Sequence, residues 1–388
     1  MAYITPVSKA AMHLGFDAKR LFNNFTGLGN YSRTLLRNLA ERAPEHSYYL
    51  FSPRAGRREE TNFFFNNPSY EVITPPRSRR PFWRTWGMRK DLRHHRIDLY
   101  HGLSHELPLG INRLKIPSVV TIHDLIFRHY PKQYRTIDHL IYNFKFKKAC
   151  QTADAVIAIS ESTKRDIEQF YGIDPQKIHV IYQSCDERFL MRRPTSVRKQ
   201  VAERYNLPDT YSLYVGSLIP RKNLLGIIEA LAQLPPDLQH PLVVVGGGGT
   251  TYRRKVEERA QELSVHHFLH FTQVSFADLP VIYQLAKAFL YPSFYEGFGI
   301  PVIEALNSEV PVITSNKSSL PEAAGGNSFL VNPDSPSQIA ATWQQCLEDT
   351  RLVSKMRKAG LLHAEQFKAE QVVPKVLDLY DQLSRGSR

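Results

Sequence analysis

At 388 residues the chain exceeds the ~250–300 residues at which single hydrophobic cores stop growing, so we expect two domains. Hydrophobic residues make up 42% and charged residues 22%, as in ordinary soluble globular proteins, and no uncharged apolar run reaches the roughly 18 residues of a membrane span. Cys150, Cys185 and Cys346 show neither metal-ligand nor disulfide spacing, and residues 1–6 lack a secretory signal pattern. We therefore expect a cytoplasmic protein.

The net charge of +13 is concentrated in the first half of the chain. Residues 1–195 hold 31 Lys and Arg against 18 Asp and Glu, whereas residues 196–388 hold 19 of each. A basic half can attract nucleic acid, anionic lipid or a phosphorylated substrate.

Short β-branched or aromatic runs alternate with longer amphipathic stretches along the whole chain. In the first half, strands are predicted at 12–16, 47–51, 98–101, 119–122 and 155–159. In the second half, they are predicted at 212–215, 242–245, 268–271, 288–291 and 310–314. Helical patterns lie between them, for example at 30–42, 160–171, 223–234 and 252–263, and residues 352–383 are predicted to form two helices.

This alternation predicts an α/β fold with parallel sheets built from βαβ units. Because it occurs twice, and because the charge balance changes between Arg193 and Gln200, we expect two Rossmann-like domains in tandem, at 1–192 and 193–370. Residues 371–388 would form a C-terminal helix that crosses back to the first domain. Parallel sheets bind ligands at the carboxyl ends of their strands, so two facing sheets would place a site in the cleft between the domains.

Two short motifs follow predicted strands of the first domain. Gly27-Leu28-Gly29-Asn30-Tyr31 opens a helix, and its glycines would let backbone N–H groups approach a phosphate, although an ordinary glycine turn explains them equally well. His123 and Asp124 end the strand at 119–122, where polar side chains would point into the cleft. A helix cap and a buried structural histidine are the alternatives for this pair.

The segment from Arg77 to Lys90 mixes cations with Trp83 and Trp86. This composition suits an anionic membrane surface, with Trp at the interface and Arg on lipid phosphates. It is equally typical of a nucleic-acid surface, or of a solvated basic face with some core aromatics.

In the second domain, Gly216, Ser217 and the run Pro220-Arg221-Lys222-Asn223 follow the strand at 212–215. Arg221 offers a bidentate fork to a phosphate and Lys222 a compact point charge, so we favour anion binding over an ordinary solvated basic pair. The run from Gly246 to Gly249 is explained by a flexible strand-to-helix turn.

The most informative stretch runs from Glu296 through Gly297-Phe298-Gly299 and Pro301 to Glu304. Proline fits the first turn of a helix, so Glu296 is predicted in a loop aimed at a helix N-terminus and Glu304 about one turn inside that helix. The exposed N–H groups and positive dipole of such a helix start suit a diphosphate. Carboxylates on either side could accept hydrogen bonds from sugar hydroxyls, an arrangement that fits a sugar nucleotide.

In their order along nearly the whole chain, these motifs resemble the retaining, nucleotide-sugar-dependent glycosyltransferases of the GT-B fold, family 4. The resemblance implies an acceptor-binding first domain and a nucleotide-sugar-binding second domain. Arg221 and Lys222 would hold the donor diphosphate, Glu296 and the Gly297–Phe298–Gly299 backbone would hold the transferred sugar, and Glu304 would grip the ribose. The other implied donor contacts are His123 near the sugar's primary hydroxyl, Gly29 and Ser217 near the phosphates, and Thr272 and Val274 beside the nucleobase.

The chain departs from the family pattern in two places. Ser217 stands where many relatives carry an arginine, so Arg221 would supply that charge, and the glycine before the base-binding turn is missing at Thr272-Gln273-Val274. The Pro-Arg-Lys-Asn loop looks most like that of mannosyltransferases using GDP-mannose, with UDP-hexoses second. The basic, Trp-containing first domain indicates a glycan or lipid-linked acceptor built at the inner membrane face.

No Asp-x-Asp pair occurs in the sequence, so we expect transfer without a metal or other cofactor, with fixed cations stabilising the leaving group. Resemblance to retaining enzymes implies front-face attack, in which a donor phosphate oxygen takes the acceptor's proton. Two alternatives stay open: a nucleotide-sugar epimerase on the same fold, and a non-catalytic module that binds membrane or nucleic acid. Cleft carboxylates count against a purely electrostatic binder, and we expect no nucleic-acid partner.

Overall fold

The computed structural model describes residues 11–386, so residues 1–6, considered above for a signal pattern, lie outside it. Within this range the chain forms two compact units. Unit 1 comprises residues 11–159, 163–184 and 372–386, and unit 2 comprises residues 160–162 and 185–371. The main boundary between the units lies between residues 184 and 185, whereas the sequence analysis placed it between residues 192 and 193. The chain returns to unit 1 between residues 371 and 372.

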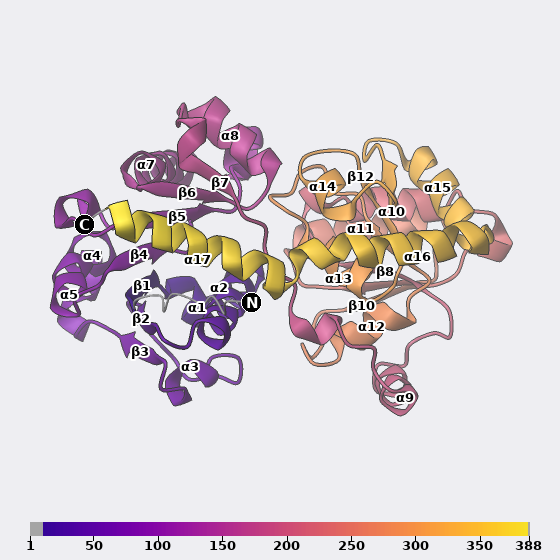
Figure 1. Cartoon of the computed structure of the whole chain (residues 1–388). Coiled ribbons are helices and arrows are strands. Elements are labelled where there is room, and N and C mark those ends of the chain that lie inside the picture. The colour runs from indigo at the N-terminus through magenta and orange to yellow at the C-terminus, as the bar shows by residue number, and fades with distance from the viewer. Residues whose placement is uncertain (1–10, 387–388) are drawn as a thin grey trace, which may run out of the picture. The chain divides into compact units, whose positions relative to one another are not determined.

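Unit 1 is built on a seven-stranded parallel sheet with the order β3-β2-β1-β4-β5-β6-β7 (Figure 1). Its strands are β1 (His13–Asp17), β2 (Ser47–Phe51), β3 (Tyr70–Ile73), β4 (Leu99–Gly102), β5 (Ser118–Ile122), β6 (Ala155–Ala158) and β7 (Ile178–Val180). Every residue of the central strands β4, β5 and β6 is buried, as expected for a parallel sheet covered on both faces.

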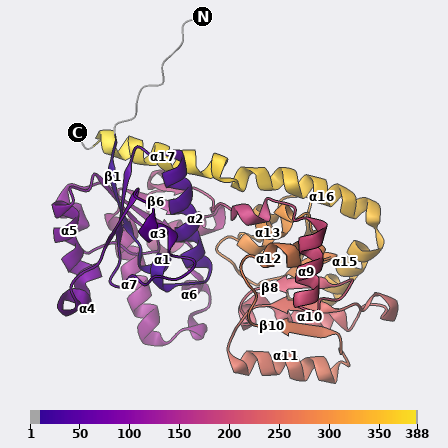
Figure 2. The same ribbon diagram turned by 90° about the horizontal axis from the view of Figure 1, so that it is seen from below.

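The sheet of unit 1 is covered by helices, and all of them except the C-terminal α17 lie between its strands in sequence (Figure 2). These are α1 (Lys19–Asn23), α2 (Gly27–Arg42), α3 (Phe63–Asn66), α4 (Arg80–Phe82), α5 (Met88–His94), α6 (Ile126–His129), α7 (Thr136–Thr152), α8 (Glu161–Tyr171) and α17 (Ala369–Gly386). The last of them is tied to the sheet by Tyr380, whose hydroxyl lies 2.5 Å from Nδ1 of the buried His101 on β4.

Unit 2 is built on a six-stranded parallel sheet with the order β10-β9-β8-β11-β12-β13. Its strands are β8 (Ser212–Val215), β9 (Leu242–Val245), β10 (Phe268–Phe271), β11 (Ala288–Tyr291), β12 (Val312–Ser315) and β13 (Phe329–Val331). Its helices are α9 (Thr195–Arg204), α10 (Leu224–Leu231), α11 (Thr250–Glu262), α12 (Leu279–Leu285), α13 (Ile300–Asn307), α14 (Leu320–Ala324), α15 (Pro336–Glu348) and α16 (Thr350–Ala364).

The predicted α/β fold with two parallel sheets is confirmed. Each of the ten predicted strands is present, with ends shifted by no more than two residues, and residues 352–383 fall in α16 and α17 as expected. The prediction missed β3, β7 and β13, and each of these lies at an edge of its sheet. Helix α2 begins at Gly27, earlier than the helix predicted at 30–42, so the predicted glycine loop is the first turn of that helix.

The strand orders place a topological switch point in each sheet. In unit 1 the chain builds outward from β1 to β3 on one side and from β4 to β7 on the other. In unit 2 the same division falls between β8 and β11. Loops after two such neighbouring strands diverge and leave a crevice at their carboxyl ends, where ligands of open α/β sheets bind. In the part of the chain that the structure describes, no helix is long and apolar enough to cross a membrane.

Candidate functional site: the switch point of unit 2

The loop after β8 carries the predicted cation pair and is held in a defined shape. Pro220–Lys222 forms a single 3₁₀ turn, and Asn223 then adopts a left-handed conformation with φ of 59°. Asparagine tolerates this region better than most residues. Its side chain accepts from the amide of Gly226 at 3.3 Å, which caps α10, and donates to the carbonyl oxygens of Pro292 and Pro333 at 3.2 and 2.7 Å. Asn223 therefore fixes the cation loop against the loop after β11.

Arg221, Lys222 and Glu296 form one ionic cluster at the switch point. Arg221 Nη1 lies 3.0 Å and Lys222 Nζ 3.1 Å from Oε1 of Glu296. Arg221 also donates to the carbonyl oxygen of Tyr295. The three charged side chains are only 10 to 13% exposed, so water screens them little. The resemblance assigned these residues to one donor, and the structure brings them into contact because β8 and β11 are neighbours in the sheet.

The Glu296 carboxyl is held in its ionised form. Burial by itself would raise its pKa, but Lys222 and Arg221 outweigh burial through their charges and hydrogen bonds and lower the pKa to about 2. All contacts that its carboxylate makes within residues 11–386 use Oε1. With two cations around one carboxylate, the cluster carries a net positive charge.

Tyr291 is part of the cluster, and the sequence analysis missed it. It is the last residue of β11 and is buried. Its hydroxyl accepts from Lys222 Nζ and donates to Glu296 Oε1 at 3.1 Å, while the Lys222 ammonium lies 4.8 Å from the ring centroid. The position of this tyrosine at the carboxyl end of a strand next to β8 is the signal that could have identified it.

Glu304 lies one turn inside α13, as predicted, but in a different electrostatic setting. Pro301 occupies the first turn of the helix, and Gly299 precedes it with φ of 120°. Burial, with a smaller contribution from Asp186, raises the pKa of Glu304 to about 7, although a 2.9 Å hydrogen bond from the Tyr283 hydroxyl lowers it. The two glutamates of the motif therefore differ: the pKa of Glu296 lies far below neutrality, whereas that of Glu304 lies close to it.

The Gly297–Phe298–Gly299 turn is anchored by serines. Ser319 Oγ lies 2.8 Å from the carbonyl oxygens of both Glu296 and Phe298, and Ser318 Oγ accepts from the amide of Glu296 at 3.0 Å. A Cβ at Gly299 would lie 2.9 Å from Leu320 Cδ2, so packing as well as φ requires glycine there. This turn therefore holds Glu296 and the start of α13 in a fixed relation.

Ser217, Thr272 and Val274 lie away from these contacts. Ser217 is exposed on the loop after β8, and its carbonyl oxygen accepts from the Tyr214 hydroxyl at 3.1 Å. Thr272, exposed, and Val274, half-buried, follow β10, which is the edge strand two positions from β8.

Two predicted site residues, His123 and Gly29, belong to unit 1, and contacts within that unit explain their positions. His123 is buried, with Nε2 2.9 Å from the carbonyl oxygen of Leu103 and Nδ1 3.0 Å from Gln183 Nε2. Because a carbonyl only accepts, Nε2 carries the proton. Burial lowers the pKa of His123 to about 4, so the ring is neutral at physiological pH.

Gly29, the other predicted site residue of unit 1, lies in the first turn of α2. Its amide donates to Asn24 Oδ1 at 3.1 Å, and a Cβ there would lie 1.7 Å from the Asn24 carbonyl oxygen. Close packing inside unit 1 therefore explains this glycine, and its amide would have to leave Asn24 in order to reach a phosphate.

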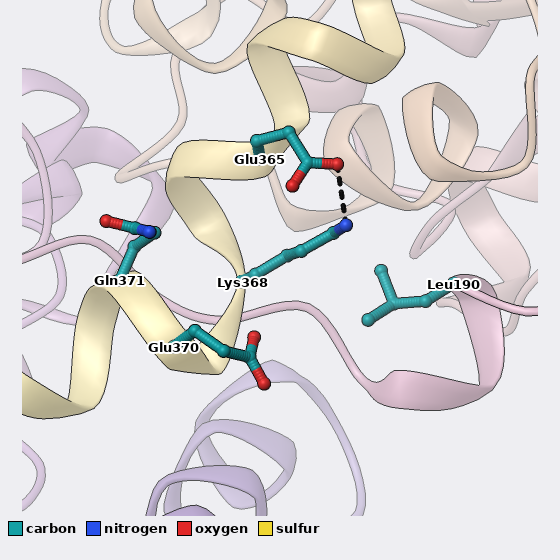
Figure 3. A pocket seen from close by; sticks show the side chains of 5 residues that line it. All are labelled: Leu190, Glu365, Lys368, Glu370 and Gln371. Carbon is teal, nitrogen blue, oxygen red and sulfur yellow. Dashed lines mark hydrogen bonds and ion pairs between the residues drawn. The ribbon is translucent and has the colours of Figure 1, made fainter.

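A pocket of about 410 Å³ lies elsewhere in unit 2, beside the start of α17 (Figure 3). It is lined by Leu190, Glu365, Lys368, Glu370 and Gln371. The one cation of its lining, Lys368, pairs with Glu365 at 2.6 Å. Two carboxylates against one paired cation would repel a diphosphate, and none of the predicted site residues lines this pocket. Within residues 11–386, no three His, Cys, Asp or Glu side chains are grouped so that they could hold a metal ion.

Two Rossmann-like sheets in tandem, with a cationic loop and a helix start at the second switch point, define the GT-B class of glycosyltransferases. A family model described as "Glycosyl transferases group 1" matches residues 198–363, and one described as "Glycosyltransferase Family 4" matches residues 25–189. Because the two models together match most of the chain, the protein belongs to this family of glycosyltransferases.

Named relatives agree with this assignment. The chain is 28% identical to O-antigen chain mannosyltransferase B of Escherichia coli, over 95% of this chain and 99% of the relative. It is 27% identical to O-antigen chain mannosyltransferase RfbU of Salmonella typhimurium, over 86% and 89% of the two chains. The crystal structure of Anabaena HepE in complex with UDP-glucose shares the fold, with a TM-score of 0.75, 18% identity and coverage of 96% and 100%.

Proposed function

We propose that this glycosyltransferase moves a hexose from a nucleotide sugar to a glycan or lipid-linked acceptor in surface polysaccharide synthesis. The preferred donor is GDP-mannose. Two relatives that match most of the chain are named O-antigen mannosyltransferases, and this supports both the sugar and the pathway class. Membership of a glycosyltransferase family counts against the epimerase and the non-catalytic alternatives.

One observation carries the proposal: Arg221 and Lys222 lie at the switch point of unit 2, and both bind the carboxylate of Glu296. The cluster keeps one positive charge in excess, in a buried setting where electrostatic attraction is stronger than in water. A diphosphate placed there would gain two cations and the N-terminus of α13. Fixed donors of this kind stabilise developing charge without reorganising during the reaction.

We further propose that transfer proceeds on one face of the sugar, with retention. The bond between the anomeric carbon and the diphosphate oxygen breaks while a bond to the acceptor oxygen forms. The acceptor's proton passes to an oxygen of the departing diphosphate, whose negative charge Lys222 and Arg221 offset. No side chain then has to act as general base, which accords with an ionised Glu296 engaged by two cations and with a neutral His123.

The other residues are given binding roles. Oε2 of Glu296 would accept from a hydroxyl of the transferred sugar, since the contacts within the protein use Oε1. Glu304 would accept from the ribose hydroxyls, and Thr272 and Val274 would border the base. For His123, contact with the sugar's primary hydroxyl requires that hydroxyl to replace Gln183 at Nδ1. We propose that Gly29 and Ser217 approach the phosphates.

We propose that no metal takes part. The proposal rests on the missing Asp-x-Asp pair and on Arg221 and Lys222, which supply the charge that a divalent ion would otherwise supply.

The test is a panel of nucleotide sugars assayed for nucleotide release with and without glycan acceptors, in the presence and absence of excess EDTA. We expect acceptor-dependent release of GDP from GDP-mannose, unchanged by EDTA, and an anomeric configuration equal to the donor's by NMR. Inversion would overturn the mechanism, loss of activity in EDTA would overturn the metal prediction, and release from UDP-hexoses alone would overturn the choice of donor. UDP-glucose is the second donor to test, because HepE of the same fold binds it.

A further inference from the structure

Helix α7 exposes a continuous row of large apolar side chains. Ile137, Leu140, Ile141 and Phe144 are 43 to 63% exposed. They are spaced i, i+3, i+4 and i+7, so they lie on one face of the helix. Both views show α7 at the margin of unit 1 (Figures 1 and 2). Contiguous exposed apolar patches are uncommon on soluble proteins and mark interaction surfaces.

The same helix also has a conventional buried face. Phe146, Ala149 and Cys150 pack into the core of unit 1 with residues of β5 and β6. At 100° per residue these positions lie on the side of α7 opposite the exposed row. The buried face of α7 therefore packs into the core, and none of the four residues of the outer row is among the buried residues of that core.

Exposed cations flank the apolar row at both ends. Lys147 and Lys148 follow Phe144 by about one turn, and Lys132 and Arg135 precede the helix. The one acidic residue of α7, Asp138, is half-buried and lies to the side of the row. Apolar side chains with long cations at their ends match the boundary between acyl chains and anionic headgroups.

A second exposed aromatic pair lies on a segment that an ion-pair network links to α7. Phe82 is 69% and Trp86 47% exposed, and their ring centroids are 5.5 Å apart. Arg84, between them in sequence, binds Oε2 of Glu106 at 2.7 Å, and Lys145, next to Phe144, binds the same oxygen at 3.1 Å. One carboxylate oxygen thus joins the segment of the aromatic pair to α7.

The basic segment from Arg77 to Lys90 does not expose all of its aromatic and cationic side chains to solvent. Trp83 is buried and donates to Asp91 Oδ2 at 2.6 Å, and Arg84 is engaged by carboxylates. Within this segment, Phe82 and Trp86 are the aromatic side chains that reach solvent. We therefore define the apolar face as Phe82, Trp86, Ile137, Leu140, Ile141 and Phe144.

We infer that the apolar face docks on an anionic lipid bilayer, with its side chains among the acyl chains and Lys147 and Lys148 on lipid phosphates. Pairing of two copies through this face is disfavoured, because it would bring the lysine ends of one copy near those of the other. The inference goes beyond sugar transfer and does not depend on it.

The test is co-sedimentation of the full chain with vesicles, without any donor. Vesicles of phosphatidylcholine with about one third phosphatidylglycerol are compared with pure phosphatidylcholine. We expect binding to the anionic vesicles that weakens with salt, falls by about tenfold or more in Leu140→Gln/Phe144→Gln, and falls also in Lys147→Glu/Lys148→Glu. The matched control is Leu362→Gln, which removes an exposed leucine of α16 in unit 2 and should bind as the wild type does.

Trp86 supplies a second readout, because the other two tryptophans, Trp83 and Trp343, are buried. Vesicles should shift its emission to the blue, and Trp86→Phe should abolish the shift. Absence of wild-type binding to the anionic vesicles, or undiminished binding by Leu140→Gln/Phe144→Gln, would overturn the inference. So would a wild-type dimer that this double substitution converts to a monomer, since that result makes the face a contact between copies. Because no sugar is needed, failure here is distinguishable from failure of the proposed function.

Discussion

The switch points of the two sheets carry opposite charge arrangements. In unit 2, one carboxylate, Glu296, lies between two cations. In unit 1, one guanidinium, that of Arg84, lies between two carboxylates: its Nη2 binds Asp17 at the end of β1 at 2.5 Å, and its Nη1 binds Glu106 after β4 at 2.7 Å. Burial lowers the pKa of Arg84, but the two carboxylates outweigh burial and raise it above its ordinary value.

This difference indicates that the charge of Arg84 stabilises the fold, whereas the charges of Arg221 and Lys222 can bind a ligand. Arg84 satisfies two carboxylates at once, and Asp17 is almost fully buried, so removing Arg84 would leave charge unpaired in the interior. Lys222 shares its carboxylate with Arg221, so removing Lys222 leaves Glu296 paired. We therefore predict that the cation at the switch point of unit 1, Arg84, stabilises the fold, and that Lys222 at the switch point of unit 2 binds the ligand.

The largest effect should come from Lys222→Ala. If the lysine offsets charge on the leaving diphosphate, turnover should fall by about 10²- to 10³-fold, while the melting temperature changes little. Steady-state nucleotide release and thermal unfolding are the measurements. Lys317→Ala, which removes an exposed, ion-paired lysine of the same unit, is the matched control and should keep its activity. Near-normal turnover in Lys222→Ala would remove Lys222 from the site.

Arg84→Met should show the reverse pattern. Leaving Asp17 unpaired should cost about 3 kcal/mol or more, a fall in melting temperature of roughly 10 °C. Adding Asp17→Asn to Arg84→Met should restore part of the loss, because the buried charge is then gone. A melting temperature equal to that of the wild type would contradict the structural role of Arg84.

Tyr291→Phe should have a smaller effect on activity. It removes a hydroxyl that accepts from Lys222 and donates to Glu296, and a hydrogen bond to a charged group is worth about 1.5–3 kcal/mol. We expect kcat to fall by about 10- to 100-fold, with little change in the KM for donor, since the charges remain but lose their fixed positions. The control is Tyr214→Phe, because the Tyr214 hydroxyl donates to the Ser217 carbonyl instead. Equal kcat values in the two variants would contradict a positioning role.

The smallest effect should appear as pH dependence at Glu304. Its pKa in the folded protein, about 7, lies above the ordinary value of 4.5, so its contribution to stability is present below pH ~4.5 and is lost as the pH rises through ~7. Glu304→Gln should therefore melt above the wild type at pH 8 and close to it at pH 5. A flat difference between the two melting temperatures would show that Glu304 does not titrate in this range.

The pH dependence of nucleotide binding tests the pKa of the Glu304 carboxyl independently of stability. Ribose hydroxyls would favour the ionised carboxylate, so the affinity for GDP should fall as the pH drops below about 7, by at most about tenfold per pH unit. Calorimetric titration of Glu304→Gln should show weaker binding without that dependence. The contrast with Glu296, whose pKa is held at about 2, would then separate the two glutamates of one motif.

Much of the fold and the core of the candidate site could be predicted from the sequence, for identifiable reasons. Central parallel strands such as β6 and β11 are buried throughout, so each appears as an uninterrupted apolar run. Edge strands β3, β7 and β13 are partly exposed. Glu71 and His179 interrupt the apolar run in β3 and β7, and β13 is only three residues long. The proximity of Lys222 and Glu296 could be anticipated because both follow strand ends. Tyr291 gives the same kind of signal at the end of β11, but the signal is weaker, because tyrosine at a strand end is also ordinary core.

The sequence by itself determined the two α/β halves, their basic and neutral charge, and the residue types at the second switch point. The periodicity of apolar residues and the succession of strands and helices along the chain are local properties, and a single sequence contains them. Only the tertiary structure decided that Gly29 serves packing, that both ring nitrogens of His123 are engaged, and that the outer face of α7 meets solvent. A helix that is apolar on both sides has the pattern of a buried helix until the neighbours of each face are known, because burial depends on residues distant in the chain.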